Sequence, residues 1–240
     1  MVRPGDVVAD IGAGSGVLSH LALRAGASKV YAVELLPKTF QFLRRTLRTN
    51  GIEDRVIAVQ ADGEKWVPPE RVDVVLCELM ETGLLHEPIA SVMRHVQRWP
   101  HRPRAILPQG ANLSVRLVDA FTEYHAYRVQ NAGFQPRCRR LLSKAICYAS
   151  YDFLDNPPGT GVDTSVEIPV EVAGTASAIR LETTALVSPA NRARPSARHC
   201  TPLVLTLDEP LRVRRGERLT VKLRYSFSFD DAPIEFQCIP

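Results

Sequence analysis

The sequence predicts an α/β + β fold, in which a Rossmann-like sheet is followed by an antiparallel β-barrel or sandwich domain. Residues 1–108 alternate short apolar runs with helical patterns, which is typical of βαβ units and a parallel sheet. Residues 109–240 instead contain β-like runs separated by glycine, proline and asparagine. A glycine-rich loop at 10–16 joins the first apolar run to the first helical segment. We therefore expect two domains, with their boundary near residue 108.

Five apolar runs in the first domain are expected to be strands, alternating with helices. The strands are expected at 7–12, 29–35, 56–62, 72–78 and 104–108. Helical periodicity predicts helices at 16–24, 38–49 and 89–99. The apolar face of the first helix is expected to carry Val17, Leu18, Leu21 and Ala22.

The second domain is predicted to consist of antiparallel strands. Its β-like runs occupy 111–120, 166–174, 178–187, 201–211 and 218–229. Gly216 marks a turn between the last two runs. Residues 120–148 are open to two interpretations, a helix or an extended arm.

Composition narrows the class of protein. The formal net charge is +4 without a block of like charge, and the basic stretch at 212–218 alternates like a strand and turn, which argues against a nucleic-acid surface. No apolar run approaches the roughly 20 residues that span a bilayer, and no signal peptide is evident at the start. The five cysteines contain no CxxC pair, so we expect neither a metal site nor a disulfide framework, and a cytoplasmic location.

The glycine loop, DIGAGSG, suits a ligand that approaches the backbone closely at a helix N-terminus. It departs from the dinucleotide fingerprint, because Val17 stands where the last glycine should be. Asp10 lies at the strand end just before the loop, where it would face an amino group or cation and not a pyrophosphate.

Two more carboxylates end the next two strands. Glu34 could accept both hydroxyls of a ribose, and Asp62 could reach an adenine ring. Together with Asp10 they suit a ligand that has an amino group and a ribose but no phosphates, and S-adenosylmethionine is such a ligand. The alternative interpretation is that Asp10 and Asp62 cap helices and that Glu34 lies on the surface.

The stretch from Val7 to Glu34, VVADIGAGSGVLSHLALRAGASKVYAVE, resembles the first two motifs of class I methyltransferases. That resemblance implies S-adenosylmethionine as methyl donor and a seven-strand doubly wound sheet. It assigns cofactor contacts to the methionine end (Asp10, Gly12, Gly14), the ribose end (Glu34, Leu35) and the adenine (Asp62, Gly63, Glu64).

The segment CELMETGLLHE, residues 77–87, places acids among apolar residues. Glu78 emerges where the fourth strand ends, and Glu87 follows nine residues later, across a turn expected at Thr82-Gly83. A tight hairpin would bring the two carboxylates together, and they would repel unless a cation lay between them. A guanidinium fits best, because it is planar, always charged and presents several donors.

The stretch VDVVLCELMETGLLHE, residues 72–87, resembles the double-glutamate hairpin of protein arginine methyltransferases. The resemblance implies that Glu78 and Glu87 clamp the substrate guanidinium, with Glu78 also beside the cofactor. Its amino-acid sequence is closer to that of the monomethylating subgroup of the family, which implies monomethylarginine as the product. Glu81 matches an extra acid of that subgroup or is a surface acid of the hairpin, and His86 is interpreted as a flank of Glu87.

Segments of the second domain, AGTASAIRLETTALVSP and HCTPLVLTLDEPLRVRRGERL, resemble the barrel of the same family. There the family carries a Thr-His-Trp loop, and in register this chain reads Arg198-His199-Cys200. His199 would orient a glutamate or relay its proton, or it is a plain structural histidine. The resemblance implies that residues 120–148 are a remnant of the family's dimer arm, and a homodimer is a further expectation.

The chain also departs from the family, because it starts at the first strand without the helices that close over the cofactor. Weak cofactor binding is therefore expected. The substrate is expected to be an arginine-containing protein or peptide, or a small guanidino compound. Two alternatives stay open, namely a methyltransferase acting on another amine and a non-catalytic binding partner.

Overall fold

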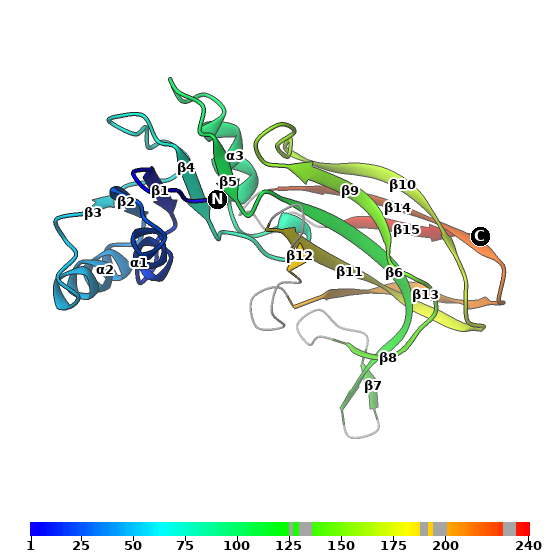
Figure 1. Cartoon of the computed structure of the whole chain (residues 1–240). Helices are drawn as coiled ribbons and strands as arrows, with labels where there is room; N and C mark the ends of the chain where they lie inside the picture. Colours follow the sequence, from blue (N-terminus) through cyan, green and yellow to red (C-terminus); the bar gives the residue numbers. More distant parts are fainter. Residues whose placement is uncertain (125–126, 130–135, 188–191, 194–200, 228–233) are drawn as a thin grey trace.

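The computed structural model describes residues 1–240 except 125–126, 130–135, 188–191, 194–200 and 228–233. It has two parts that lie side by side, a parallel sheet with helices and an elongated antiparallel part (Figure 1). The sheet strands are β1 (Val7–Ile11), β2 (Lys29–Glu34), β3 (Val56–Gln60), β4 (Val74–Cys77) and β5 (Ala105–Leu107). The helices are α1 (Val17–Arg24), α2 (Pro37–Thr49), α3 (Ile89–Val96) and a short 3₁₀ turn, η1 (Thr82–Leu84).

The parallel sheet has the strand order β3-β2-β1-β4-β5, and every neighbouring pair is parallel. All five strands expected from the sequence are present, and the order reverses between β1 and β4, where ligands bind in open α/β sheets. The seven strands implied by the resemblance are not seen, because after β5 the described chain continues directly into the antiparallel part.

Helices cover both faces of this sheet. Val8, the second residue of β1, packs in the core formed with α1 and α2. The next residue, Ala9, packs in the other core, with α3, and Ile11, two residues further, packs there too. This alternation, which is the period of a strand, gives the sheet a buried face on each side.

The prediction for the apolar face of α1 was largely wrong. Val17 and Leu21 are 61% and 49% exposed, and Leu18 is also exposed. The residues that α1 buries are Ser19, Ala22 and Leu23. The helix therefore turns its small side chains toward the sheet, and a hydroxyl is the group that it brings into the interior.

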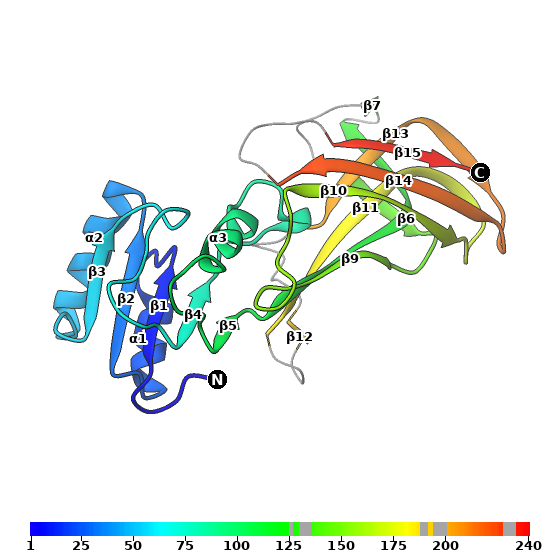
Figure 2. The same cartoon turned by 90° about the horizontal axis from the view of Figure 1, so that it is seen from above.

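The antiparallel part consists of two sheets (Figure 2), and apolar side chains of both belong to one core. The larger sheet centres on two long strands, β6 (Gly110–Tyr124) and β11 (Gly174–Leu186), which pair with each other. It also holds β7 (Tyr127–Val129), β8 (Arg137–Leu141), β9 (Ile146–Asp152), β12 (Arg192–Ala193) and β13 (Leu203–Val213). The smaller sheet is formed by β10 (Gly161–Pro169), β14 (Arg218–Ser226) and β15 (Glu235–Ile239).

Two sequence expectations change in this part. The run at 166–174 is not one strand, because β10 ends at Pro169 and β11 begins at Gly174. The described residues of 120–148 form strands and no helix, and Figure 1 shows β7 and β8 at the far edge of the larger sheet. The backbone of β7 pairs with the end of β6.

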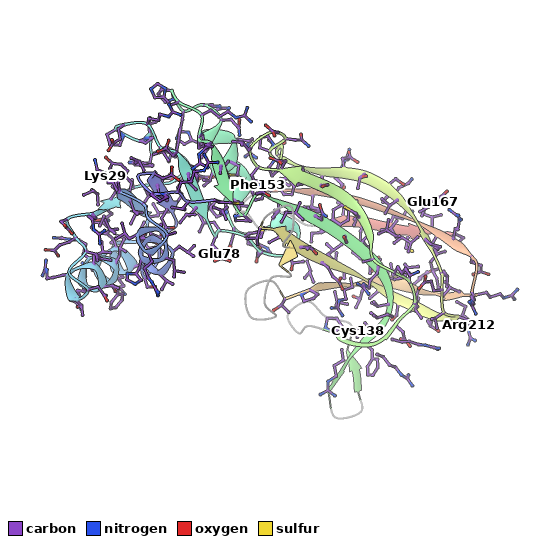
Figure 3. The ribbon with its side chains drawn as sticks, in the orientation of Figure 1. Lys29, Glu78, Cys138, Phe153, Glu167 and Arg212 are labelled. Carbon is purple, nitrogen blue, oxygen red and sulfur yellow. The ribbon has the colours of Figure 1, made fainter. Side chains whose placement is uncertain are left out.

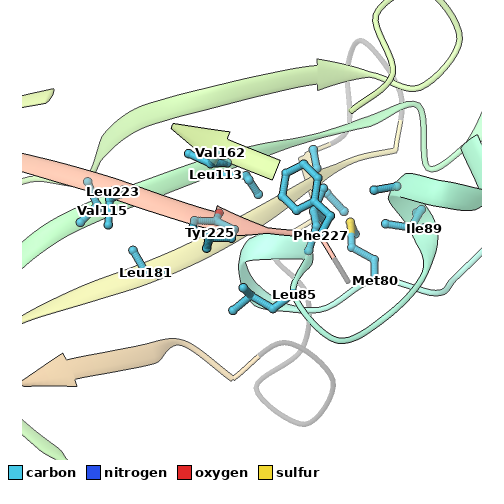
Figure 4. Close-up of a cluster of buried hydrophobic side chains, with 14 of the residues drawn as sticks. Met80, Leu85, Ile89, Leu113, Val115, Val162, Leu181, Leu223, Tyr225 and Phe227 are labelled. Carbon is cyan, nitrogen blue, oxygen red and sulfur yellow. The ribbon is translucent and has the colours of Figure 1, made fainter. Parts of the chain in front are cut away.

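One apolar core joins the two parts. It contains Ile11 and Met93 of the first part together with Leu113, Leu181 and Tyr225 of the second. Three residues of the loop between β4 and α3 also belong to it, namely Met80, Leu84 and Leu85 (Figure 4). This core therefore fixes the segment in which the two candidate glutamates lie.

Candidate active site

The glycine loop turns sharply between β1 and α1. Gly12, Gly14 and Gly16 all have positive φ, at 77°, 55° and 85°. These backbone conformations cost glycine little and other residues more. A Cβ at Gly12 would lie 2.5 Å from Cδ2 of Leu79, so the leucine packs directly on the glycine backbone. The loop is thus in contact with the segment that follows β4.

Asp10 is buried at the end of β1, with 1% of its surface exposed. The Ser19 hydroxyl of α1 donates a hydrogen bond of 2.6 Å to its Oδ2. Burial raises the pKa of Asp10 to about 6, although the Ser19 hydrogen bond acts in the opposite direction, and the charge of Glu34 adds to the increase. A cation placed beside Asp10 would stabilise its charged form.

Glu34, at the end of β2, is also buried, at 6% exposure. Its carboxylate accepts backbone hydrogen bonds from Gly14 (3.0 Å) and Leu36 (2.9 Å), one on each oxygen. The surface interpretation of Glu34 is therefore wrong. Each oxygen keeps a second lone pair that can accept a ligand hydroxyl, and the carboxylate ties the glycine loop to the end of β2. The adjacent Leu35 is 57% exposed.

Asp62 lies just after β3 and organises its own turn. Its Oδ1 accepts the backbone N–H of Glu64 at 2.9 Å, and its Oδ2 pairs with Nζ of Lys65 at 2.8 Å. The Lys65 hydrogen bond lowers the pKa of Asp62. A Cβ on Gly63 would lie 2.4 Å from Cγ2 of Ile11, so this turn packs against β1. Asp62 thus caps a turn and not a helix, so the helix-capping interpretation of Asp62 is wrong.

The acidic loop, which we define as residues 78–87, connects β4 to α3. Glu78 follows Cys77, the last residue of β4, and is exposed, whereas Glu87 is half-buried. Figure 3 places Glu78 between the two parts of the molecule. Burial raises the pKa of the Cys77 thiol, and the charges of Asp10, Glu78 and Glu87 raise it further. All three carboxylates therefore lie close enough to one thiol to act on it electrostatically.

The loop turns where the sequence predicted, at Thr82-Gly83, but it forms the 3₁₀ turn η1 and no β-hairpin. Gly83 and Leu84 both have positive φ, at 75° and 57°. Met80, Leu84 and Leu85 are buried, at 4%, 0% and 6% exposure. The apolar residues of the loop thus point into the core, which leaves the acids at its two ends.

Glu81 closes the loop on itself. Its Oε1 accepts hydrogen bonds from the backbone N–H and from Nδ1 of His86, the latter at 2.6 Å. The Glu81 side chain is 28% exposed and that of His86 is 57% exposed. Glu81 therefore has a local structural role, in which His86 is its partner.

His199 lies outside the described residues, so its assignment stays a prediction. Among the described residues there is no cluster of His, Cys, Asp and Glu that could hold a metal ion, and no helix long and apolar enough to cross a membrane. Sequence reasoning missed Ser19, which contacts Asp10, and Leu79, which contacts Gly12. A serine within an otherwise apolar helical segment is the signal that could have identified Ser19.

The comparisons with known proteins that name an activity find methyltransferases. A family model described as the TRM5/TYW2 methyltransferase domain matches residues 1–99. Over 227 residues the chain is 29% identical to the uncharacterized protein MJ1452 of Methanocaldococcus jannaschii, covering 94% of this chain and 83% of that protein. It is 28% identical over 253 residues to the arginine N(omega)-methyltransferase of Streptomyces achromogenes, covering 94% of this chain and 70% of that protein.

Other matches are similar to one part or to the fold. The histone-arginine methyltransferase CARMER of Anopheles gambiae is 36% identical over 124 residues, which is 52% of this chain and only 19% of CARMER. Among solved structures, the PRMT1 enzyme-prozyme complex of Trypanosoma brucei with AdoHcy aligns with a TM-score of 0.75. That alignment covers 100% of this chain and 90% of the other at 18% identity, which shows a shared fold.

Proposed function

We propose that the chain transfers a methyl group from S-adenosylmethionine to a guanidinium. The chain is a class I methyltransferase similar to protein arginine methyltransferases (PRMTs), and the comparisons leave its subgroup unresolved. The observation that supports this function is the acidic loop, which lies where the strand order of the parallel sheet reverses. Two glutamates flank a buried turn in this loop, beside the ends of β1 and β4.

The residues at the ends of β1 and β2 fit S-adenosylmethionine. Asp10 is a buried carboxylate whose pKa is raised to about 6, which is an environment that an amino or sulfonium group would relieve. The carboxylate of Glu34 can accept ribose hydroxyls with its remaining lone pairs. The cofactor supplies an electrophilic methyl group. Gly12 and Gly14 would border its methionine end, and the turn at Asp62, Gly63 and Glu64, with Leu35, its adenosine end.

Glu78 and Glu87 would hold the guanidinium between them. One carboxylate can bind two guanidinium nitrogens in a fork geometry. The other draws positive charge away from the nitrogen that forms the new N–methyl bond, and accepts the proton released as that bond forms. Fixing the reacting nitrogen in line with the methyl group contributes further, up to about 7–11 kcal/mol in the best cases.

The substrate is proposed to be an arginine side chain of a protein or peptide, with monomethylarginine as product. A small guanidino compound is the second candidate, because a relative that aligns over 94% of this chain is named an arginine N(omega)-methyltransferase. We expect the reaction to take place in a reducing cytoplasm, since the five cysteines are scattered along the sequence without a CxxC pair. Dimerisation stays a prediction.

Mass spectrometry can test the reaction directly. The protein is incubated with S-adenosylmethionine and either an arginine peptide or free arginine, and a gain of one methylene mass on a guanidinium nitrogen is expected. A free-arginine product without peptide methylation would favour the small-substrate candidate. If no guanidino compound or amine is methylated and S-adenosylhomocysteine does not bind, the non-catalytic alternative remains.

Variants of the acidic loop test the assigned residues. Glu78→Gln and Glu87→Gln should each lower kcat at least about a hundredfold, because each removes a charge that the guanidinium needs. Binding of S-adenosylhomocysteine should stay near wild type in isothermal titration. Glu209→Gln, which changes an exposed glutamate of β13, is the matched control. Full activity in either loop variant would refute the clamp.

A further inference from the structure

The turn of the acidic loop is attached to the antiparallel part by hydrogen bonds. The backbone N–H of Gly83 donates to Oγ1 of Thr183, on β11, at 2.8 Å. The Thr82 hydroxyl donates to the backbone carbonyl of Thr201 at 2.9 Å. Thr82 and Thr183 are 5% and 6% exposed. Because 100 residues separate Gly83 from Thr183, this attachment depends on the assembly of the two parts.

The backbone of the turn needs such an attachment. Gly83 and Leu84 are consecutive residues with positive φ. In the part of the chain that the structure describes, Leu84 is the one non-glycine residue with this conformation. A left-handed conformation is unfavourable for leucine, and it persists only where the surroundings impose it. The buried Leu84 side chain and the bond from Gly83 to Thr183 are two such constraints.

A pair of hydrogen-bonded tyrosines lies beside the turn of the acidic loop. A Cβ on Gly83 would lie 3.5 Å from the hydroxyl of Tyr225, on β14. The hydroxyls of Tyr225 and Tyr148 are 2.7 Å apart and hydrogen-bonded. Burial raises the pKa of both phenols, so both stay neutral at physiological pH. Figure 4 shows Tyr225 and Leu85 in the same cluster of buried side chains.

We propose that Thr183 is a positioning residue of the active site, which sets the placement of Glu87 relative to Glu78 by holding the backbone of Gly83. This inference rests on the proposed function of the acidic pair. Thr183 acts through its hydrogen bond to the backbone of Gly83. Its effect would pass through the turn to Glu87, which lies two residues before α3.

The test compares three threonine variants. Thr183→Val keeps the shape but removes the acceptor, which leaves the Gly83 N–H buried without a partner. Thr183→Ser keeps the hydroxyl. Thr184→Val changes the neighbouring residue, whose side chain points to the other face of β11, and is the matched control. All are measured for kcat, for KM of both substrates and for affinity toward S-adenosylhomocysteine.

We expect Thr183→Val to lower kcat about ten- to a hundredfold, which is the scale of a misplaced reacting group. Affinity for S-adenosylhomocysteine should change less than about twofold, and Thr183→Ser should retain near-normal kcat. Unchanged kcat in Thr183→Val would overturn the proposal, and so would an equal loss in the valine and serine variants. If the valine variant does not fold, Thr183→Cys replaces it, because a thiol is a weak acceptor.

Hydrogen exchange of the loop separates this proposal from the proposed function. Peptides covering residues 78–88 should exchange faster in Thr183→Val than in Thr183→Ser, Thr184→Val or wild type. This readout needs no catalysis, so it decides the attachment even if the wild-type protein methylates no guanidinium. Equal exchange in all four proteins would overturn the proposed tether.

Discussion

Replacing Ser19 with alanine should weaken cofactor binding at neutral pH, because it removes a hydrogen bond that favours the charged form of Asp10. The Ser19 hydroxyl lies 2.6 Å from Oδ2 of Asp10, and both side chains are buried. Burial already raises the pKa of Asp10 to about 6, while the serine opposes that increase. Without the serine, the proton should be lost only at higher pH.

The magnitude follows from the energy of such a bond. A hydrogen bond to a charged group contributes about 1.5–3 kcal/mol, and each pKa unit corresponds to about 1.4 kcal/mol. The pKa of Asp10 should therefore rise from about 6 to about 7–8 in the variant. At pH 7, roughly nine-tenths of the wild-type protein would carry the charge, but only about half or less of the variant.

Isothermal titration with S-adenosylhomocysteine between pH 5 and pH 9 is the assay. The affinity of the wild type should fall as the pH drops below about 6, whereas that of Ser19→Ala should already fall below about pH 7–8. Ser150→Ala, which changes an exposed serine of β9, should behave like the wild type. Asp10→Asn should bind weakly without this inflection. The same inflection in Ser19→Ala and wild type would refute the reasoning.

Asp10 affects protein stability and cofactor binding with opposite pH dependence. The pKa of Asp10 is raised from 3.8 to about 6 in the folded protein, so the folded state binds more protons than the unfolded state between these values. The contribution of Asp10 to stability is thus present in full at low pH and is lost as the pH rises through about 6. It corresponds to roughly 3 kcal/mol.

Three further changes test the geometry of the site. Gly12→Ala should abolish binding of S-adenosylhomocysteine in titration, since the new Cβ would lie 2.5 Å from Leu79 and the φ of residue 12 is +77°. The double variant Gly12→Ala with Leu79→Ala should recover only part of this binding, because it removes the clash but not the backbone strain. Glu34→Gln should weaken that affinity at least about tenfold, because an amide nitrogen then faces a backbone N–H donor. Glu81→Ala should lower kcat several-fold without changing this affinity, because His86 loses the acceptor that closes the loop, and unchanged kcat would contradict that role.

The strands of the parallel sheet could be predicted because each is a short apolar run, and β1 to β4 each have a carboxylate in their last residues or shortly after them. Asp10, Glu34 and Glu78 all come at strand ends, and parallel strands bring these ends to one edge. The apolar face of α1 was predicted wrongly, since Leu18 and Leu21 are exposed. Periodicity identifies an amphipathic helix, but it does not say which side meets the sheet when small residues pack closer.

The acidic loop was predictable only in part. Thr82-Gly83 is a turn signal, and the apolar residues around it predict burial, and both are found. The contact between Gly83 and Thr183 joins residues 100 positions apart, and no local pattern in either segment encodes it. In the antiparallel part, the expected run at 166–174 fails for a related reason, because the backbone N–H groups of Glu171 and Val172 donate to the distant carbonyl of Leu142, and residues 170–173 belong to no strand.

The two glutamates are held by different parts of the protein. Glu78 directly follows Cys77, which pairs with Ile11 of β1, so the parallel sheet fixes its backbone. Glu87 comes after the turn, whose polar contacts lie on the antiparallel part. A change at Thr183 should therefore move Glu87 more than Glu78, and should leave Leu79 on the glycine loop. This difference explains why we expect such a change to affect turnover while cofactor affinity is preserved.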